Sequence, residues 1–201
     1  RYFTSNPDQT LVVRYTASRK KAITAKVSLC MLRHSTVSTH VVNNRCANLV
    51  VDGDARFDKN GEGGVNFRGE VRVITEGGTI ITTDDTITVT AANAMTIVCD
   101  IRTDFHNPDY RVLCDKTAEQ AASKTYTQLK ADHVADYQPL FRRMSISLGT
   151  DVNASTEELI AEARKGRPSP TFDALFFQYG RYMQIASSRE NSPLPSNLQG
   201  V

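Results

Sequence analysis

The sequence contains no tryptophan, no long apolar run and no surplus of one charge. Lys and Arg number 24 against 22 Asp and Glu, and the basic residues are scattered, so the charge footprint of a nucleic-acid-binding protein is missing. No stretch approaches the roughly 18 uninterrupted apolar residues of a membrane span. We therefore expect no nucleic-acid partner, no membrane insertion and an uncharged substrate.

The four cysteines form no metal-binding pattern. Cys30, Cys46, Cys99 and Cys114 lie far apart, with neither a CxxC pair nor a Cys/His cluster among them, which argues against a structural zinc site. The motifs of serine hydrolases and of phosphate-binding loops are missing as well. The sequence thus predicts no metal and no cofactor, and it leaves open whether the cysteines are buried thiols or disulfides.

The first half of the chain alternates apolar and polar residues from Thr10 to about Thr103, as strands with one buried face do. We expect strands at 11–15, 23–32, 49–51, 65–73, 79–82, 86–90 and 95–101. The dipeptides Asp52-Gly53, Asn60-Gly61, Gly63-Gly64 and Gly77-Gly78 predict tight hairpin turns between strands. Many short antiparallel strands at this spacing indicate a β-sandwich.

After Pro108 the apolar period becomes helical. Thr117 and Gln120 have the spacing of a capping box, and the apolar residues that follow predict one long amphipathic helix ending near Pro139. Ser155 and Glu158 then cap a shorter helix, which Gly166 and Pro168 terminate.

A further helix is expected after Ser169-Pro170, because a cap followed by a first-turn proline is typical of a helix start. Its apolar stripe contains Phe172, Phe176, Tyr179 and Met183, and Gly180 within it suggests a close helix neighbour. Soluble monomers rarely expose such a stripe. We therefore expect the chain to continue into a helical domain past Val201.

Several polar residues are candidates for a chemical role, but a structural role also explains each of them. Asp52-Gly53-Asp54, with Asp58, Asn60 and Glu62 after it, resembles a calcium loop, but hairpin turns use the same residues. The pairs Asp84-Asp85 and Glu157-Glu158 fit solvated surface, since sequence neighbours point to different faces. His133, on the apolar stripe of the long helix, is a candidate ligand or base, and packing is the favoured interpretation.

Three sequence blocks resemble glycoside hydrolase family 95. The most specific block comprises FFQYGRYM at 176–183, SSR at 187–189 and LPSNLQGV at 194–201. RYFTS at 1–5 with PDQ at 7–9 is similar to an entry into the later strands of the family's N-terminal domain. A third block, which is similar to its linker motif, comprises His133, Asp136-Tyr137, LFRR at 140–143 and Leu148-Gly149.

The resemblance implies an antiparallel β-sandwich of the galactose-mutarotase-like supersandwich type, then a helical linker and the start of an (α/α)6 barrel. The sandwich would comprise residues 1–110 and lack its first strands. The helical linker would comprise residues 111–168, and the start of the barrel residues 169–201. The barrel would open with the helix around Phe172–Ala186, and the remainder of this catalytic barrel would be its packing partner.

The family's activity implies a secreted or periplasmic glycosidase that removes terminal α-L-fucosyl or related L-galactosyl residues from an oligosaccharide or glycan. In this inverting mechanism a glutamic acid protonates the leaving oxygen and an aspartate activates water. Both would follow Val201, so the resemblance assigns no catalytic residue to this chain, and residues 1–201 alone are predicted to be inactive.

Asn197 and Gln199 are the candidate substrate-binding residues, since their amides can bond sugar hydroxyls; the alternative is that they satisfy loop backbone groups. Arg181 is expected to pair with a buried carboxylate, chiefly in a structural role. Two other functions stay open. One is a non-catalytic carbohydrate-binding or interaction sandwich, and the other is a related (α/α)6 phosphorylase.

Overall fold

The computed structural model describes residues 1–29, 34–55, 64–149, 152–190 and 192. Its contacts divide the chain into two compact units, residues 1–133 and 134–201, and each is described by itself. The three-part division expected from the sequence stays a prediction. Among the described residues, no helix combines the length and apolar character that crossing a membrane requires.

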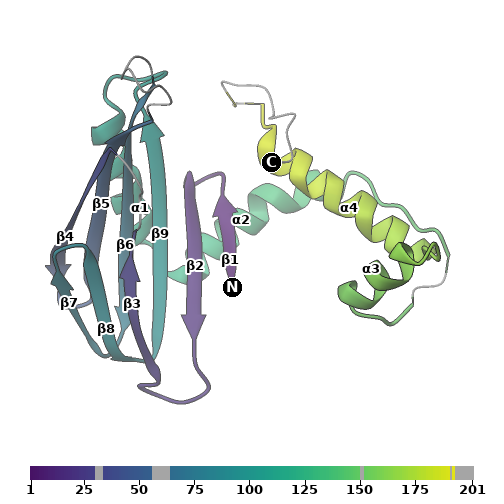
Figure 1. Cartoon of the computed structure of the whole chain (residues 1–201), viewed down its shortest axis with the longest axis horizontal. Coiled ribbons are helices and arrows are strands. Elements are labelled where there is room, and N and C mark those ends of the chain that lie inside the picture. Colours follow the sequence, from purple (N-terminus) through teal and green to yellow (C-terminus); the bar gives the residue numbers. More distant parts are fainter. Residues whose placement is uncertain (30–33, 56–63, 150–151, 191, 193–201) are drawn as a thin grey trace. The chain divides into compact units, whose positions relative to one another are not determined.

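The first unit is built on two antiparallel sheets (Figure 1). The larger sheet has the strand order β1-β2-β9-β6-β5-β4, and its strands are β1 (Tyr2–Ser5), β2 (Thr10–Thr16), β4 (Ser35–Asn43), β5 (Cys46–Asp54), β6 (Asn66–Glu76) and β9 (Ala94–Thr103). The smaller sheet has the order β3-β8-β7 and contains β3 (Ile23–Ser28), β7 (Thr79–Thr83) and β8 (Thr86–Ala92).

The main core lies between these two sheets. Alternate residues of the strands β3 to β9 point into it, and Leu49, Val73, Ile87 and Val89 are completely buried there. In β6 the buried residues include Val71 and Val73, in the alternation that the sequence pattern predicts. The predicted β-sandwich followed by helices is therefore confirmed.

A second core lies on the other face of the larger sheet. There Val12 and Val98 pack with Ala121 and Leu129, which belong to helix α1 (Tyr110–Ser123) and helix α2 (Tyr126–Phe141). The larger sheet is thus covered on one face by the smaller sheet and on the other by helices. The face of the central strands β6 and β9 toward the smaller sheet is apolar, whereas their face toward the helices also carries charged residues such as Arg68, Glu70 and Asp100.

The turn predictions need correction. Asp52-Gly53 lies inside β5, where Gly53 pairs with Phe67 of β6, and not at a hairpin. Gly77 and Gly78 do have positive φ angles of 72° and 73°, but they carry the chain from β6 in one sheet to β7 in the other. Asn60-Gly61 and Gly63 lie outside the described residues.

Gly78 cannot be replaced without moving backbone. A Cβ built at this position would lie 2.3 Å from the carbonyl oxygen of Thr90 and 2.7 Å from the amide of Ala92. The positive φ and the crowded backbone both require glycine at this crossing.

The single long helix expected after Thr117 is two helices. Lys124 is extended, with φ −85° and ψ 150°, and ends α1. Thr125 and Gln128 then form the N-terminal cap of α2, because the Gln128 side chain accepts from the Thr125 amide and the Gln128 amide donates to the Thr125 hydroxyl. Thr117 lies within α1, so the predicted capping box there is wrong.

The second unit contains the end of α2 followed by α3 (Thr156–Arg164) and α4 (Pro170–Ser187). Both predicted caps of α3 and α4 are confirmed. Ser155 and Glu158 form the reciprocal capping box of α3, and the Ser169 side chain accepts from the Phe172 amide ahead of Pro170. Gly166, with φ +75°, follows the end of α3 as expected.

Candidate functional site

Charged side chains are concentrated on the face of the larger sheet that α1 covers. Arg68 is their centre, because its Nε lies 2.6 Å from Asp115 Oδ1 and its Nη1 lies 2.6 Å from Asp52 Oδ2. Arg111 of α1 approaches Asp52 as well, at 3.1 Å. These ion pairs connect β5, β6 and α1, so their role is structural.

Two buried carboxylates lie in this layer, and a glycosidase uses a pair of carboxyl groups. Glu70 is 1% exposed and bonds Arg72 Nε at 2.6 Å, and Asp100 is 7% exposed and bonds Arg102 Nε at 2.6 Å. Burial raises the pKa of both carboxyl groups, against the effect of the neighbouring arginines.

A glycosidase needs its two carboxyl groups on either side of a bound sugar, with room for the ring between them. Glu70 and Asp100 are each held by an arginine and are almost fully covered. They therefore serve the packing of α1 on the sheet, and they are not candidates for the catalytic acid and base.

The described cysteines are free thiols, which decides a question that the sequence left open for them. Cys46 and Cys114 are buried and Cys99 is partly exposed, while Cys30 lies outside the described residues. Burial raises the pKa of Cys114 to about 12 and that of Cys99 to about 11. Their thiolate forms are scarce near neutral pH, so these cysteines are poor nucleophiles.

The described residues contain no group of three or more His, Cys, Asp or Glu side chains that could hold a metal ion. Asp52, from the suspected calcium loop, instead pairs with Arg68 and Arg111. Asp58, Asn60 and Glu62 of that loop lie outside the described residues.

The remaining candidates for chemistry occupy ordinary structural places. The His133 ring stacks on Phe3, with centroids 4.7 Å apart and an interplanar angle of 24°, which agrees with the packing interpretation. Asp84 and Asp85 form the exposed β7–β8 turn, and Glu157 and Glu158 are exposed in the first turn of α3. Hydrogen bonds from Ser155 lower the pKa of Glu158.

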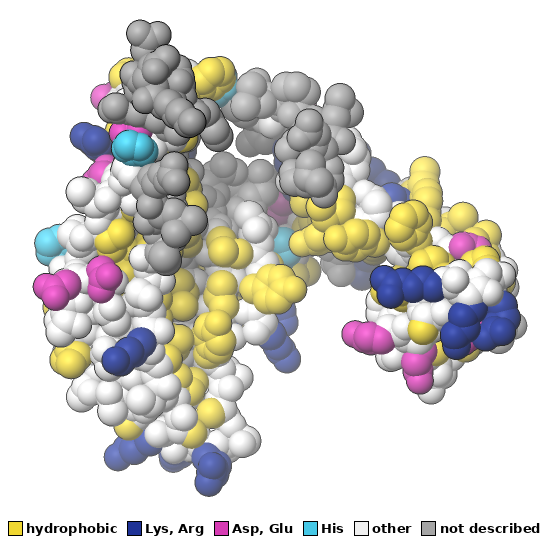
Figure 2. All heavy atoms as spheres, in the orientation of Figure 1, with side chains coloured by type: hydrophobic (Ala, Val, Ile, Leu, Met, Phe, Trp, Pro, Cys, Tyr) yellow, Lys and Arg dark blue, Asp and Glu magenta, His cyan; other side chains and the backbone are white. Residues whose placement is uncertain are grey.

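In the second unit, α4 exposes most of its apolar stripe. Phe176 is 68% exposed, Tyr179 is 59% and Met183 is 50%, and Figure 2 shows hydrophobic side chains gathered along this helix. A concavity of about 550 Å³ beside Gly180 is lined by Phe176, Phe177 and Gln184, among others. The close neighbour expected from Gly180 is not found among the described residues, where a Cβ on it would meet no atom within 4 Å.

Arg181 fixes α4 to the end of α2. Its Nη1 donates to the Met144 carbonyl at 2.6 Å, and its Nη2 donates to the Phe141 carbonyl at 2.9 Å and the Leu140 carbonyl at 3.4 Å. The expected partner was a buried carboxylate; the partners found are the Leu140 and Phe141 carbonyls at the end of α2, the Met144 carbonyl beyond it and the Gln178 side-chain oxygen. Such carbonyls carry partial negative charge and lack helical donors, so a guanidinium satisfies them.

A second connection follows α4. Arg189 Nη2 donates to Asp136 Oδ1 at 2.5 Å, with both side chains mostly buried. Residues from the two motifs quoted above thus meet across 53 positions of sequence. This pair was not predicted, because no sequence spacing relates a residue on α2 to one that follows α4.

The contact between Asp136 and Arg189 holds the chain just before the LPSNLQGV block. Asn197 and Gln199, the candidate substrate-binding residues, belong to that block and lie outside the described residues. The described part of the site is therefore a scaffold: α2 and α4 are fastened together by Arg181 and Arg189, and one face of α4 is uncovered.

Two family models match different parts of the chain. The model of the glycosyl hydrolase family 65 N-terminal domain matches residues 1–108, and that of the glycosyl hydrolase family 95 catalytic domain matches residues 125–201. The first match coincides with the strand region and the second contains α2, α3 and α4.

Three curated relatives, all named as alpha-fucosidases, agree with the match to a glycosyl hydrolase family. "Alpha-L-fucosidase 2" of Arabidopsis thaliana is 26% identical over 233 aligned residues, covering 100% of this chain and 27% of the relative. "Probable alpha-fucosidase A" of Aspergillus niger is 42% identical over 99 residues, covering 47% of this chain and 12% of the relative. The protein of the same name from Aspergillus oryzae is 33% identical over 102 residues, covering 48% of this chain and 14% of the relative. The chain thus spans about a quarter or less of the length of these relatives.

Proposed function

We propose that this chain is part of an enzyme that removes terminal α-L-fucosyl residues from oligosaccharides. The chain belongs to the glycosyl hydrolases by its family 65 N-terminal domain, and its catalytic segment is similar to family 95. The names of the relatives quoted above support fucose as the sugar. A related L-galactosyl residue is the closest alternative substrate.

The chemistry proposed is inverting hydrolysis by two carboxyl groups outside residues 1–201. One protonates the leaving oxygen, and the other activates a water on the opposite face of the sugar, which places the carboxyl groups roughly 6.5–9.5 Å apart. The arginine-bound carboxylates Glu70 and Asp100 are consistent with this, because neither offers space for a sugar.

Within this scheme the chain supplies a scaffold and part of the sugar site. The uncovered face of α4 would pack against further helices of an (α/α)6 barrel, which would bury Phe176, Tyr179 and Met183. Asn197 and Gln199 would bond the sugar hydroxyls from the segment that follows Arg189 in the sequence.

The observation that carries the proposal is the coincidence of the family 95 catalytic match with an α4 whose aromatic stripe has no cover among the described residues. A self-contained binding sandwich would have no use for such a helix, and exposing it would be costly in water. The secreted or periplasmic location stays a prediction.

The test compares residues 1–201 with the longer parent polypeptide on an oligosaccharide ending in α-L-fucose. We expect the parent to release free fucose with inverted anomeric configuration, followed by NMR, and residues 1–201 to release none. Glycan binding without release would favour the non-catalytic module, and fucose phosphate formed only with added phosphate would favour phosphorolysis. Hydrolysis by residues 1–201 alone would contradict the proposed placement of the catalytic residues.

A further inference from the structure

The segment between α2 and α3 exposes an asparagine that a serine follows two positions later. Asn153-Ala154-Ser155 has the acceptor pattern for N-linked glycans, which is an asparagine, any residue except proline, and then a serine or threonine. No other asparagine of residues 1–201 stands in this pattern. Because such a tripeptide also arises by chance, its place in the structure determines whether it can carry a glycan.

Asn153 lies at the centre of a tight turn on the surface. The Ala154 amide donates to the Val152 carbonyl at 3.0 Å, and this bond closes a three-residue turn around Asn153. The side chains of Val152, Asn153 and Ser155 are all exposed. A bulky, strongly hydrated group attached to the Asn153 amide would therefore extend into solvent.

This segment approaches α4 from the side away from its concavity. The Val152 amide donates to the hydroxyl of Thr171, in the first turn of α4, at 2.8 Å. Gly180 follows Thr171 by about two and a half helical turns, so the two residues lie on opposite sides of the helix. Helices that cover the concavity beside Gly180 would leave the side of Asn153 in solvent.

We propose that Asn153 carries an N-linked oligosaccharide in the secreted enzyme. In the transfer, the side-chain amide nitrogen of Asn153 bonds to the anomeric carbon of an oligosaccharide that is held on a lipid diphosphate. The bond from that carbon to the diphosphate oxygen breaks, the amide loses one proton, and the lipid diphosphate leaves. No oxidant or reductant is needed.

Ser155 would have two roles at different times. In the folded chain its side chain caps α3 by accepting from the Glu158 amide at 3.3 Å. Glycan transfer to this pattern takes place on the chain before it folds, when the cap has not formed, so the two roles do not compete. They can be separated by substitution, because aspartate also caps helices but does not complete the acceptor pattern.

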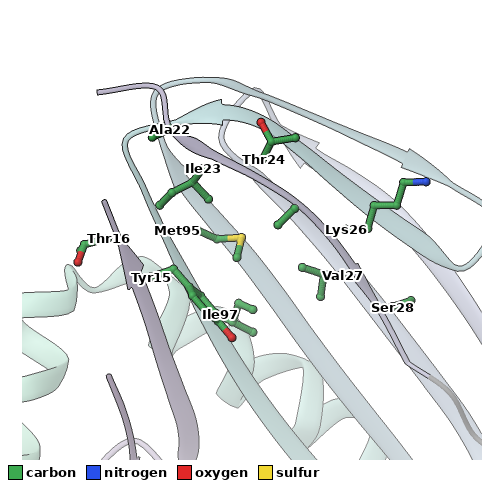
Figure 3. Close-up of a pocket in the computed structure, with 11 residues that line it drawn as sticks. Tyr15, Thr16, Ala22, Ile23, Thr24, Lys26, Val27, Ser28, Met95 and Ile97 are labelled. Atoms are coloured by element: carbon green, nitrogen blue, oxygen red, sulfur yellow. The ribbon is translucent and has the colours of Figure 1, made fainter. Parts of the chain in front are cut away.

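The sandwich exposes hydroxyl groups without a matching asparagine. A pocket of about 580 Å³ beside β3 is lined by Thr16, Thr24 and Ser28, among other residues, and Figure 3 shows them at its edge. None of the three follows an asparagine by two positions. An exposed hydroxyl group is thus no sign of an acceptor by itself, whereas at Asn153 the pattern, the turn and the exposure coincide.

This inference rests on the proposed function in one respect, namely export of the enzyme by a cell that makes N-linked glycans. The two can fail separately, because one is measured as fucose release and the other as the mass of one peptide. A secreted parent polypeptide that releases fucose but has no glycan at Asn153 would overturn this inference alone.

The test is peptide mass spectrometry of the parent polypeptide secreted from yeast behind a cleavable leader. Treatment with a peptide N-glycosidase in water labelled with heavy oxygen converts a glycosylated asparagine into a labelled aspartate, which assigns the site to one residue. The variants are Asn153→Gln and Ser155→Asp. Ser155→Thr is the matched control, because threonine keeps both the helix cap and the acceptor pattern.

We expect a glycan at Asn153 in the parent and in Ser155→Thr, and its complete loss in Asn153→Gln and Ser155→Asp. An unmodified Asn153 in the secreted parent would overturn the proposal. So would a glycan that persists in Ser155→Asp, since the modification would then not depend on the acceptor pattern.

Discussion

Replacing Arg181 with methionine should loosen α4 from the end of α2. Methionine retains much of the aliphatic stem but removes the guanidinium that donates to the carbonyls of Leu140, Phe141 and Met144. Two of these bonds are short, at 2.6 and 2.9 Å, and the third is weak at 3.4 Å.

We expect Arg181→Met to reduce the free energy that holds α4 to the end of α2 by about 2 kcal/mol. Charge-assisted hydrogen bonds contribute about 1.5–3 kcal/mol each when buried, and the partial exposure of Arg181 reduces the two short bonds to about 1 kcal/mol each. The interaction of a cation with the C-terminal end of α2 is included in this sum, because the same carbonyls produce both effects. Arg181→Lys should lose about half as much, since one ammonium cannot reach all three carbonyls.

Native-state hydrogen exchange is the appropriate assay, because it reports each helix separately. Amides of residues 134–141 and 170–187 should lose protection by about tenfold to thirtyfold in Arg181→Met, while those of the sandwich core stay unchanged. Arg143→Met, at an exposed arginine close by, is the matched control and should have little effect. If Arg181→Met left the exchange of both helices unchanged, the assignment of Arg181 as their fastening would be wrong.

Three further outcomes are expected. Leu129→Ala, at a side chain 1% exposed under the larger sheet, should cost about 2–5 kcal/mol in urea unfolding, and a cost below about 1 kcal/mol would contradict its place in the core. Because burial raises the folded-state pKa of Glu70, the folded protein binds the proton more tightly than the unfolded chain. That contribution to stability is present below the ordinary pKa of glutamate and is lost as pH rises through the higher folded value. Glu70→Gln should therefore flatten the fall in unfolding free energy above the ordinary pKa of glutamate, and an unchanged pH slope would contradict this assignment. In the parent polypeptide, Asn197→Ala should lower kcat/KM for a fucosyl substrate by about tenfold to a hundredfold with unchanged thermal stability; equal loss of stability would indicate a loop-structuring role instead.

The sheet was predictable where alternation is clean and was missed where it is not. Val71 and Val73 alternate with charged residues, so β6 is evident from the sequence. In β4 the residues from Ser35 to His40 are mostly polar on both faces, because this strand lies at the sheet edge, and no strand was expected there. The sequence also does not say which strands share a sheet, so Gly77-Gly78 was interpreted as a hairpin.

The break between α1 and α2 escaped prediction for a related reason. The apolar residues Ala118, Ala122, Tyr126 and Leu129 keep a helical spacing across Lys124, and no proline or glycine marks the interruption. The candidate site was predictable only in its local parts, namely the caps of α3 and α4. The contact of Arg189 with Asp136 depends on where the segment after α4 meets α2, which one sequence does not specify.

The crossing at Gly78 has a practical consequence for anyone who modifies this domain. A saturation library at that codon should return glycine almost alone, because every side chain would collide with main-chain atoms of the neighbouring strand. The side chains at the solvent-facing tip Asp84-Asp85 are exposed, although Asp84 has a positive φ of 43°, so a point just after Asp85 is better suited for inserting an epitope or a fluorophore.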